Sequence, residues 1–125
     1  MLRRAEVDEH WEMVKEGLTA IAKKSPFDCE IGKIRYDIRR GRLRLLIDPP
    51  RRGFLIVELK MQPAKHLLIW MAWGPNGENL TERYLPEIEA MAKQVGAKYM
   101  EIRSKRRGYE RTGWTVDDII YKKEL

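Results

Sequence analysis

One segment near the middle of the chain limits the possible folds more than any other. Residues 66–73 read His-Leu-Leu-Ile-Trp-Met-Ala-Trp, and every position after the first is apolar. Pro63 precedes this run and Gly74-Pro75 ends it. A short, continuous apolar run between turn residues is typical of a strand that is buried on both faces. We therefore expect a layered fold that mixes helices with a sheet.

Two amphipathic segments precede this strand. In the first, the apolar residues recur at spacings of four and three, and Ser25-Pro26 ends the pattern: Val7, Trp11, Val14, Leu18 and Ile21. In the second, Phe27, Ile31, Ile34 and Ile38 have helical spacing. Gly41 follows them, and glycine is common just past the end of a helix. Ile34, Tyr36 and Ile38 also alternate, which leaves a strand as the second interpretation. We predict a helix for both segments.

The spacing of apolar residues changes to that of strands after Gly41. Residues 42–48 and 54–59 are rich in Leu and Ile, and the Pro-Pro-Arg-Arg-Gly sequence between them predicts a turn. These two runs and residues 66–73 predict an antiparallel meander.

The C-terminal half alternates between helix and strand. Four residues after the glycine-containing loop 74–79 share one helical face, and Gly96 ends that helix: Leu85, Ile88, Ala92 and Val95. Asn79 or Thr81 is a candidate N-cap, and Pro86 indicates either a kink or a start near Leu85. We then expect a strand at 98–104, a short helix at 106–112 and a last strand at 115–125. The result is a single mixed α/β domain over 1–125, with a right-handed strand-helix-strand crossover after the meander.

Composition excludes several classes of protein. Four Trp and five Tyr among 125 residues supply a core that a disordered chain lacks, and no apolar run approaches the length of a membrane span. One cysteine, Cys29, excludes an internal disulfide framework, and His10 and His66 lack a metal-ligand partner at helical spacing. These features predict a cytoplasmic protein without a metal. The net charge of +6 favours phosphate-bearing partners without choosing among them.

Two segments could bind phosphate groups. Loop 74–79 leaves a buried strand and enters a helix, so its backbone amides could cradle an anion; the alternative is an ordinary turn. Five basic residues lie between Arg103 and Arg111, and they could hold a cofactor phosphate or form a solvated surface. The basic run 33–44 is most simply the solvated side of the second helix, and a protein or nucleic-acid contact is its alternative.

The sequence Tyr-Glu-Arg-Thr-Gly-Trp at 109–114 resembles the Tyr-Glu-Lys-Leu-Gly-Phe run of the GNAT acetyltransferases. The tail 119–125 is similar to that family's ending, an aromatic residue followed by basic residues and Glu-Leu. The expected order of elements is also similar to the GNAT order, without the family's first strand. Within the family, small bacteriophage proteins with a GNAT-like fold are the most similar. They share the Gly-Arg-Leu strand at 41–45, the Leu-Pro-Glu-Ile helix at 85 and the Ala-x-x-x-Gly-Ala turn at 92–97.

The resemblance implies an acyl-CoA-dependent N-acetyltransferase, with acetyl-CoA as cosubstrate and roles for particular residues. The backbone of Met71, Ala72 and Trp73 would pair with the pantetheine arm at the splay between two strands. The pyrophosphate would lie against the loop and the basic patch, formed by Gly74, Asn76, Gly77, Glu78, Asn79, Arg106 and Arg107. Tyr109 would protonate the leaving thiolate, and Glu58 or Glu101 would act as the base.

The loop departs from the family's Arg/Gln-x-x-Gly-x-Gly/Ala pattern. It has no Arg or Gln in the expected place, and Pro75 removes one backbone donor. The departure concerns CoA binding more than the fold. Two further functions therefore stay open: a non-catalytic phage or prophage protein that binds virion or host partners, and a basic nucleic-acid binder, which is the less favoured. The acceptor would be an amine on a small molecule or a protein. The protein would be cytoplasmic, in the host cytoplasm or the virion if it is phage-encoded.

Overall fold

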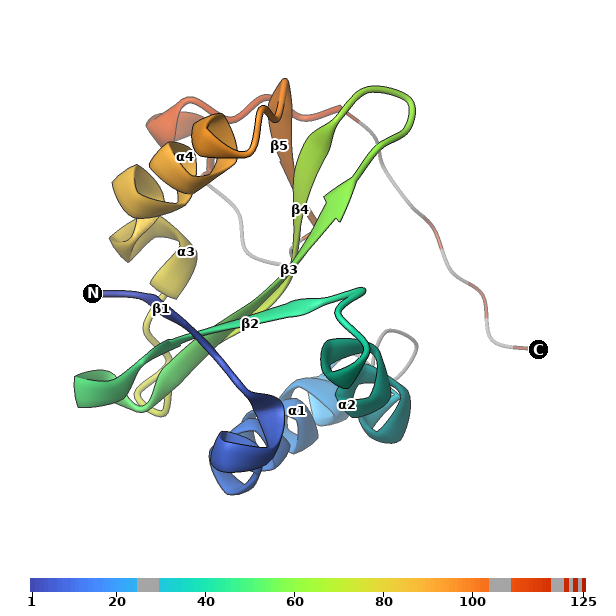
Figure 1. Cartoon of the computed structure of the whole chain (residues 1–125), viewed down its shortest axis with the longest axis vertical. Coiled ribbons are helices and arrows are strands. Elements are labelled where there is room, and N and C mark those ends of the chain that lie inside the picture. The colour runs from blue at the N-terminus through green and yellow to red at the C-terminus, as the bar shows by residue number, and fades with distance from the viewer. Residues whose placement is uncertain (25–29, 104–108, 118–120, 122, 124) are drawn as a thin grey trace.

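A computed structural model describes residues 1–24, 30–103, 109–117, 121, 123 and 125. Five strands form one sheet in the order β1-β2-β3-β4-β5 (Figure 1). They are β1 (Arg3–Ala5), β2 (Arg44–Asp48), β3 (Gly53–Lys60), β4 (His66–Trp73) and β5 (Tyr99–Ile102). Strands β1 to β4 pair antiparallel, whereas β4 and β5 pair parallel. The predicted meander, followed by a strand-helix-strand connection, is confirmed.

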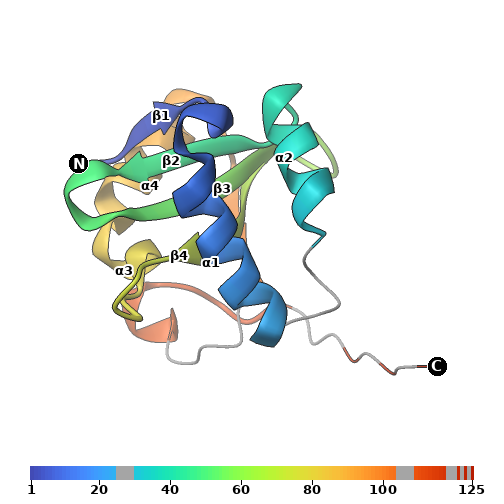
Figure 2. The ribbon, with the colours of Figure 1, turned by 90° about the horizontal axis from the view of Figure 1, so that it is seen from below.

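Helices cover both faces of this sheet (Figure 2). On one face lie η1 (Val7–His10), α1 (Trp11–Lys24) and α2 (Ile31–Arg39); on the other lie α3 (Leu80–Arg83) and α4 (Leu85–Gln94). Two short 3₁₀ helices, η2 (Pro49–Arg51) and η3 (Tyr109–Thr112), complete the described elements. No helix in the described ranges is long and apolar enough to cross a membrane.

The alternation of apolar residues along the strands builds one core on each face. In β2 and β3, Leu45 and Ile56 face α1 and α2, whereas Leu46 and Val57 face α3 and α4. All four are at most 3 % exposed. The central strands are therefore buried on both faces, as the apolar run 66–73 predicts for β4.

A bulge interrupts the pairing of β3 with β4. Ile56 pairs with Met71 and Val57 pairs with Ile69, so Trp70 is the extra residue of β4. Trp70 and Met71 consequently both pack on the α1 and α2 side of the sheet. A bulge bends its strand and re-aims the side chains around it, here just before the last three residues of β4.

The helix predicted after loop 74–79 is two short helices. Asn79 caps α3 by accepting a hydrogen bond from the backbone N–H of Glu82, and Pro86 lies in the first turn of α4. The N-cap at Asn79 and the start near Leu85 thus both occur, with Tyr84 at the junction. The helical interpretation of the second segment is confirmed from Ile31 to Arg39; Phe27 lies outside the described residues.

The expectation about the N-terminal end of the chain is wrong, and the one about the C-terminal end lies partly outside the described residues, at 118–120, 122 and 124. The family's first strand is present as β1, which the sequence conceals because it is only three residues long and two of them are exposed arginines. Its backbone pairs with β2 from Arg3↔Ile47 to Ala5↔Leu45. The last strand is not formed by the described residues of 115–125. Val116 is 65 % exposed and Tyr121 is 89 % exposed, so neither side chain is buried against the helices that cover the sheet.

Candidate functional site

Strand β4 extends further than the strand beside it. The parallel ladder runs from His66↔Tyr99 to Ile69↔Ile102, where β5 ends, but β4 continues to Trp73. No strand of the described chain pairs with residues 70–73 along this edge. The bulge at Trp70 lies at the same place. The sheet therefore opens between β4 and β5, and the predicted residues Met71, Ala72 and Trp73 lie at the opening.

Loop 74–79 connects this opening to α3. The N–H of Gly77 donates to the carbonyl oxygen of Gly74 at 3.1 Å, and Gly77 has a positive φ of 71°. Asn76 and Gly77 are exposed, whereas Gly74 is buried. The carboxylate of Glu78 accepts a hydrogen bond from Arg83 at 3.2 Å, which offsets a negative charge that would oppose an anion here.

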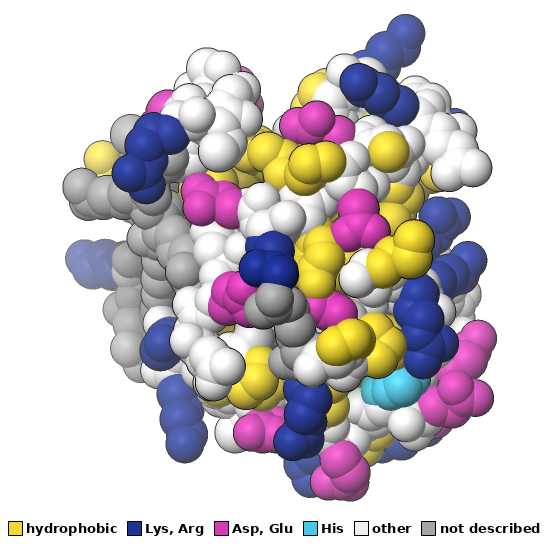
Figure 3. Space-filling view, turned by 90° about the vertical axis from the view of Figure 1, so that its left-hand side faces the viewer, with side chains coloured by type: hydrophobic (Ala, Val, Ile, Leu, Met, Phe, Trp, Pro, Cys, Tyr) yellow, Lys and Arg dark blue, Asp and Glu magenta, His cyan; other side chains and the backbone are white. Residues whose placement is uncertain are grey.

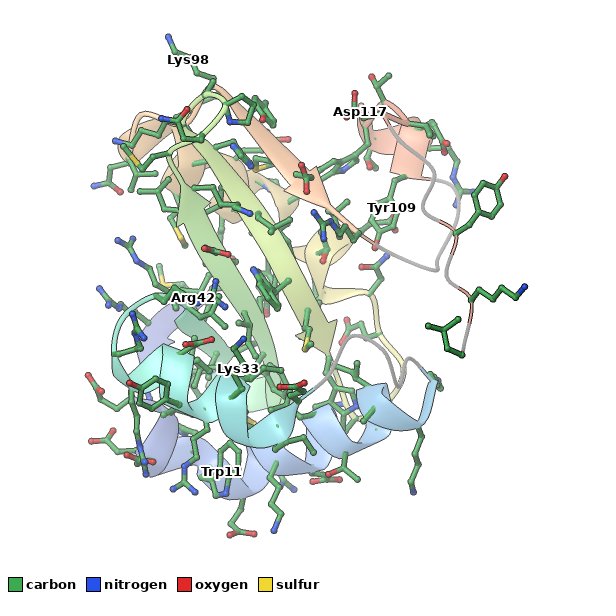
Figure 4. All side chains as sticks on the ribbon, turned by 90° about the vertical axis from the view of Figure 1, so that its right-hand side faces the viewer. Trp11, Lys33, Arg42, Lys98, Tyr109 and Asp117 are labelled. Atoms are coloured by element: carbon green, nitrogen blue, oxygen red, sulfur yellow. The ribbon has the colours of Figure 1, made fainter. Side chains whose placement is uncertain are left out.

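Asn79 joins this loop to Tyr109. Its side-chain nitrogen donates to the Tyr109 hydroxyl oxygen at 3.3 Å, across 30 residues of sequence. Tyr109 also meets Trp114 edge to face, with ring centroids 6.0 Å apart. Figure 4 shows Tyr109 reaching from η3 toward the sheet. The structure thus brings together two parts of the predicted site, the loop and the tyrosine.

One buried polar group follows the loop in the first turn of α3. Thr81 is 1 % exposed, and its hydroxyl oxygen has no hydrogen-bond partner in the described structure. Most buried hydroxyl groups are paired. The sequence suggests Thr81 only as a helix cap, and Asn79 has that role.

The two predicted carboxylates lie in one cross-strand row. Leu68 of β4 pairs with Glu58 of β3 on one side and with Glu101 of β5 on the other. Residues opposite one another in a ladder project to the same face. Glu58 and Glu101 are thus on one face, with Leu68 between them.

Their surroundings differ. One oxygen of Glu58 accepts from the indole N–H of Trp70 at 2.9 Å, and the other accepts from Arg42 at 3.3 Å. The Glu58 side chain is only 12 % exposed. Glu101 is 36 % exposed and pairs with Arg103 at 3.4 Å. Glu101 is therefore the more accessible carboxylate of the two.

Arg42 organises a cluster that the sequence does not reveal. Its guanidinium lies 5.3 Å from the centre of the Trp70 ring and donates to Asp37 at 2.9 Å. The hydrogen bond from Arg42 lowers the pKa of Asp37, although desolvation acts in the opposite direction. Only the register of β3 against β4 places Trp70 beside Glu58, so no local pattern could have predicted this cluster.

The remaining predicted residues are not tested by the structure. Arg106 and Arg107 lie outside the described residues. Within the described ranges, no three His, Cys, Asp or Glu side chains form a group that could hold a metal ion.

Comparisons with known proteins identify the architecture. No family sequence model and no curated protein sequence matches the chain. The solved aminoglycoside N-acetyltransferase AAC(6')-Iy, in complex with CoA, matches with a TM-score of 0.66 at 11 % identity, over 100 % of both chains. The same enzyme with a bisubstrate analog, CoA-S-monomethyl-acetylneamine, matches with a TM-score of 0.59 at 10 % identity, over 100 % of this chain and 98 % of the other.

A protein from Pyrococcus furiosus that is described as an acetyl transferase matches with a TM-score of 0.66 at 15 % identity, over 100 % of both chains. Identities this low carry information about the fold, which these structures share with this chain from end to end. The opening beside β4, the meander and the crossover agree with that result. The chain therefore has the fold of the GNAT acetyltransferases.

Proposed function

We propose that this protein is an acyl-CoA-dependent N-acetyltransferase. The observation that carries the proposal is the opening beside β4, where residues 70–73 continue past the last β4–β5 pair at Ile69↔Ile102. Backbone groups at an unpaired strand edge can bind an extended amide-bearing arm as an added strand would be bound. Two of the solved neighbours with this fold, both of AAC(6')-Iy, are complexes with CoA or a CoA analog, and a pantetheine arm has that chemistry.

The residues around the opening fit such a ligand in part. Met71, Ala72 and Trp73 would pair with the arm, and the amides of Gly74, Asn76 and Gly77 would face its phosphates together with Arg106 and Arg107. Pro75 supplies no N–H, so the loop offers fewer donors than the family pattern.

Acetyl-CoA supplies an activated thioester to an amine. The amine nitrogen bonds to the acetyl carbon, the carbon–sulfur bond breaks, and the sulfur takes a proton. Tyr109 would donate that proton, and the Asn79 side chain holds its hydroxyl. Glu101 would accept the proton that the amine loses, because its side chain is 36 % exposed whereas that of Glu58 is 12 % exposed. Backbone N–H groups of β4 would stabilise the developing oxyanion.

The acceptor class is an amine on a small molecule or a protein. The bisubstrate analog in one solved neighbour carries an aminoglycoside fragment, so an aminoglycoside panel is a reasonable place to begin. The alternative function is a non-catalytic phage-type protein that uses this fold to bind a virion or host partner. The altered loop is the feature that favours the alternative.

Thermal unfolding with and without acetyl-CoA tests the proposal. A ligand at 100 times its Kd adds about 2.7 kcal/mol to the free energy of unfolding, which raises Tm by several degrees for a domain of this size. Adenosine diphosphate controls for simple phosphate attraction. A shift well above this control is expected, and no shift at millimolar acetyl-CoA would overturn the proposal.

A second measurement separates binding from catalysis. Release of the CoA thiol is followed over the amine panel for the wild type, Tyr109→Phe and Tyr121→Phe. Tyr121 is 89 % exposed and serves as the matched control. We expect Tyr109→Phe alone to lower kcat while acetyl-CoA still raises Tm. Binding without turnover of any amine would favour the non-catalytic alternative.

A further inference from the structure

The outer surface of α2 carries three residues on one narrow stripe: Lys33, Tyr36 and Arg40. At about 100° per residue they fall within an arc of about 60°. Ile34 and Ile38, which are buried against the α1 side of the sheet, lie on the other side of the helix. All three stripe residues are exposed. The stripe therefore faces away from the core, on the outside of the molecule beside α1 (Figure 2).

Tyr36 contributes little to the folded core. Its side chain is 59 % exposed. The guanidinium of Arg40 lies 5.5 Å from the centre of its ring. Nothing in the packing of α2 requires an aromatic residue here, since Ile34, Ile38 and Asp37 are the buried residues of this helix. An exposed ring with a cation beside it is suited to stacking on a flat aromatic ligand.

Positive charge flanks this ring with little acidic compensation. Among the described residues, neither Lys33 nor Arg40 has an ion-pair partner. Arg35 and Arg39 share the single carboxylate of Asp8, each at 2.8 Å, so these three side chains together keep a positive charge.

The one carboxylate of this helix is that of Asp37, whose pKa is lowered first by the hydrogen bond from Arg42 and, more weakly, by the charges of Lys33 and Arg40. The Asp37 side chain is 5 % exposed and binds Arg42 at 2.9 Å. In contrast, acidic and basic side chains are interspersed on the face that Figure 3 shows. The concentration of positive charge on the α2 stripe is therefore a local feature and does not represent the protein surface in general.

We infer that α2 is a docking surface for single-stranded nucleic acid. Lys33 and Arg40 lie about 10 Å apart along the helix axis, at 1.5 Å per residue, and each binds a backbone phosphate. Tyr36 lies between them and stacks on a base. Proteins that bind single strands combine a basic track with aromatic side chains in this way. Duplex nucleic acid would use the lysine and arginine but not the ring, because its bases are already stacked.

The inference does not depend on acetyl transfer. The stripe lies on α2, whereas the opening beside β4 and loop 74–79 lead to α3 on the other face of the sheet. A failure to bind acetyl-CoA would therefore leave nucleic-acid binding testable, and the reverse also holds.

Fluorescence anisotropy with a labelled oligothymidylate of about 15 nucleotides tests the surface, with a duplex of equal length and heparin as comparison probes. The site variants are Tyr36→Ala and the double variant K33Q/R40Q. The double variant K93Q/K98Q has the same net charge as K33Q/R40Q and alters exposed lysines elsewhere. Figure 4 shows Lys98 at the far end of the sheet from Lys33. Circular dichroism and Tm confirm that each variant is folded.

We expect K33Q/R40Q to weaken binding of the single strand at least tenfold and K93Q/K98Q to weaken it far less. Loss of two phosphate contacts should reduce the slope of log K against log salt by about 1.4. Tyr36→Ala should weaken the single strand by tenfold or more and leave duplex and heparin binding unchanged. No binding by the wild type at low salt, or equal losses in both double variants, would overturn the proposal. Equal binding of all three probes with no effect of Tyr36→Ala would identify a general polyanion surface and would also overturn it.

Discussion

The amide nitrogen of Asn79 donates to the hydroxyl oxygen of Tyr109 at 3.3 Å, while the amide oxygen of the same side chain accepts the N–H of Glu82 at 3.3 Å. One side chain therefore fixes the start of α3 and holds η3 against it. Tyr109 is half-buried and 30 residues away in sequence. This contact ties the loop beside the β4 opening to the residue proposed as the proton donor.

Substitutions at Asn79 should separate these two roles. Asn79→Ser keeps a capping oxygen but removes the donor to Tyr109, so we expect nearly unchanged stability and a lower rate of acetyl transfer. Asn79→Ala removes both and should cost about 1 kcal/mol in the free energy of unfolding as well. Urea unfolding and the rate of CoA release are the measurements. If Ser and Ala lower stability equally, Asn79 is not acting as the cap.

Two glycines in helices on the same face of the sheet should respond oppositely to alanine. A Cβ on Gly17 of α1 would come within 2.7 Å of both Phe54 and Trp73, whereas a Cβ on Gly32 of α2 would meet nothing within 4 Å. Overpacking should make Gly17→Ala about 1–3 kcal/mol less stable. Gly32→Ala should gain about 0.5–1 kcal/mol from helix propensity. Urea midpoints measure both, and a stabilising Gly17→Ala would show that Trp73 can move aside.

Asp8 should make the free energy of unfolding depend on pH in the acidic range. Hydrogen bonds from Arg39 and then Arg35 lower the pKa of Asp8 from 3.8 to about 2. A carboxyl group with a depressed pKa in the folded state contributes stability above pH 3.8 and loses it as the pH falls toward 2. Asp8→Asn should therefore be less stable than the wild type at pH 6, and the difference should narrow near pH 2.

Salt provides an independent check on the same residue. Both arginines and Asp8 are at least 31 % exposed, so 0.5 M NaCl should also narrow the difference at pH 6 by screening. A difference in urea midpoint that stays constant over both pH and salt would exclude an electrostatic role for Asp8.

Tyr84 joins the junction of α3 and α4 to the end of β2. Its hydroxyl donates to Asp48, which is 1 % exposed at the end of β2. Removal of a hydrogen bond to a charged group should make Tyr84→Phe about 1–3 kcal/mol less stable. Burial, followed by the contact with Asp48, raises the pKa of Tyr84. The wild type should then lose stability above pH 10, as the phenol ionises on unfolding, and Tyr84→Phe should lose less.

The patterns that predicted most of the fold are those in which local spacing and burial agree. The apolar run 66–73 is β4, and the 7–21 spacing is η1 and α1. Gly41 and Gly96 follow their helices with φ of 86° and 80°. By contrast, β1 could not be predicted, because two of its three residues are exposed arginines and only its pairing with β2 makes it a strand.

The candidate site was predictable to a different degree. Tyr109, Met71 to Trp73 and loop 74–79 were proposed as site residues from motif and order, and the structure places the loop beside Tyr109. The contact between the loop and Tyr109 could not be predicted, because the distance from Asn79 to Tyr109 depends on the crossover between them. Glu58 and Glu101 were both proposed as the base, and only the ladder through Leu68 shows that they share a face and differ in exposure.

The sequence by itself determined most of the longer helices and strands, because apolar spacing over a few turns is a local property of the chain. The tertiary structure decided where β4 loses its partner, which carboxylate stays accessible and which helix surface remains uncovered. Each of these depends on the register of strands or on packing between segments that are distant in sequence. Such relationships are set by the simultaneous burial of a core on each face of the sheet. They involve segments that are distant in sequence, so no short stretch of the sequence predicts them.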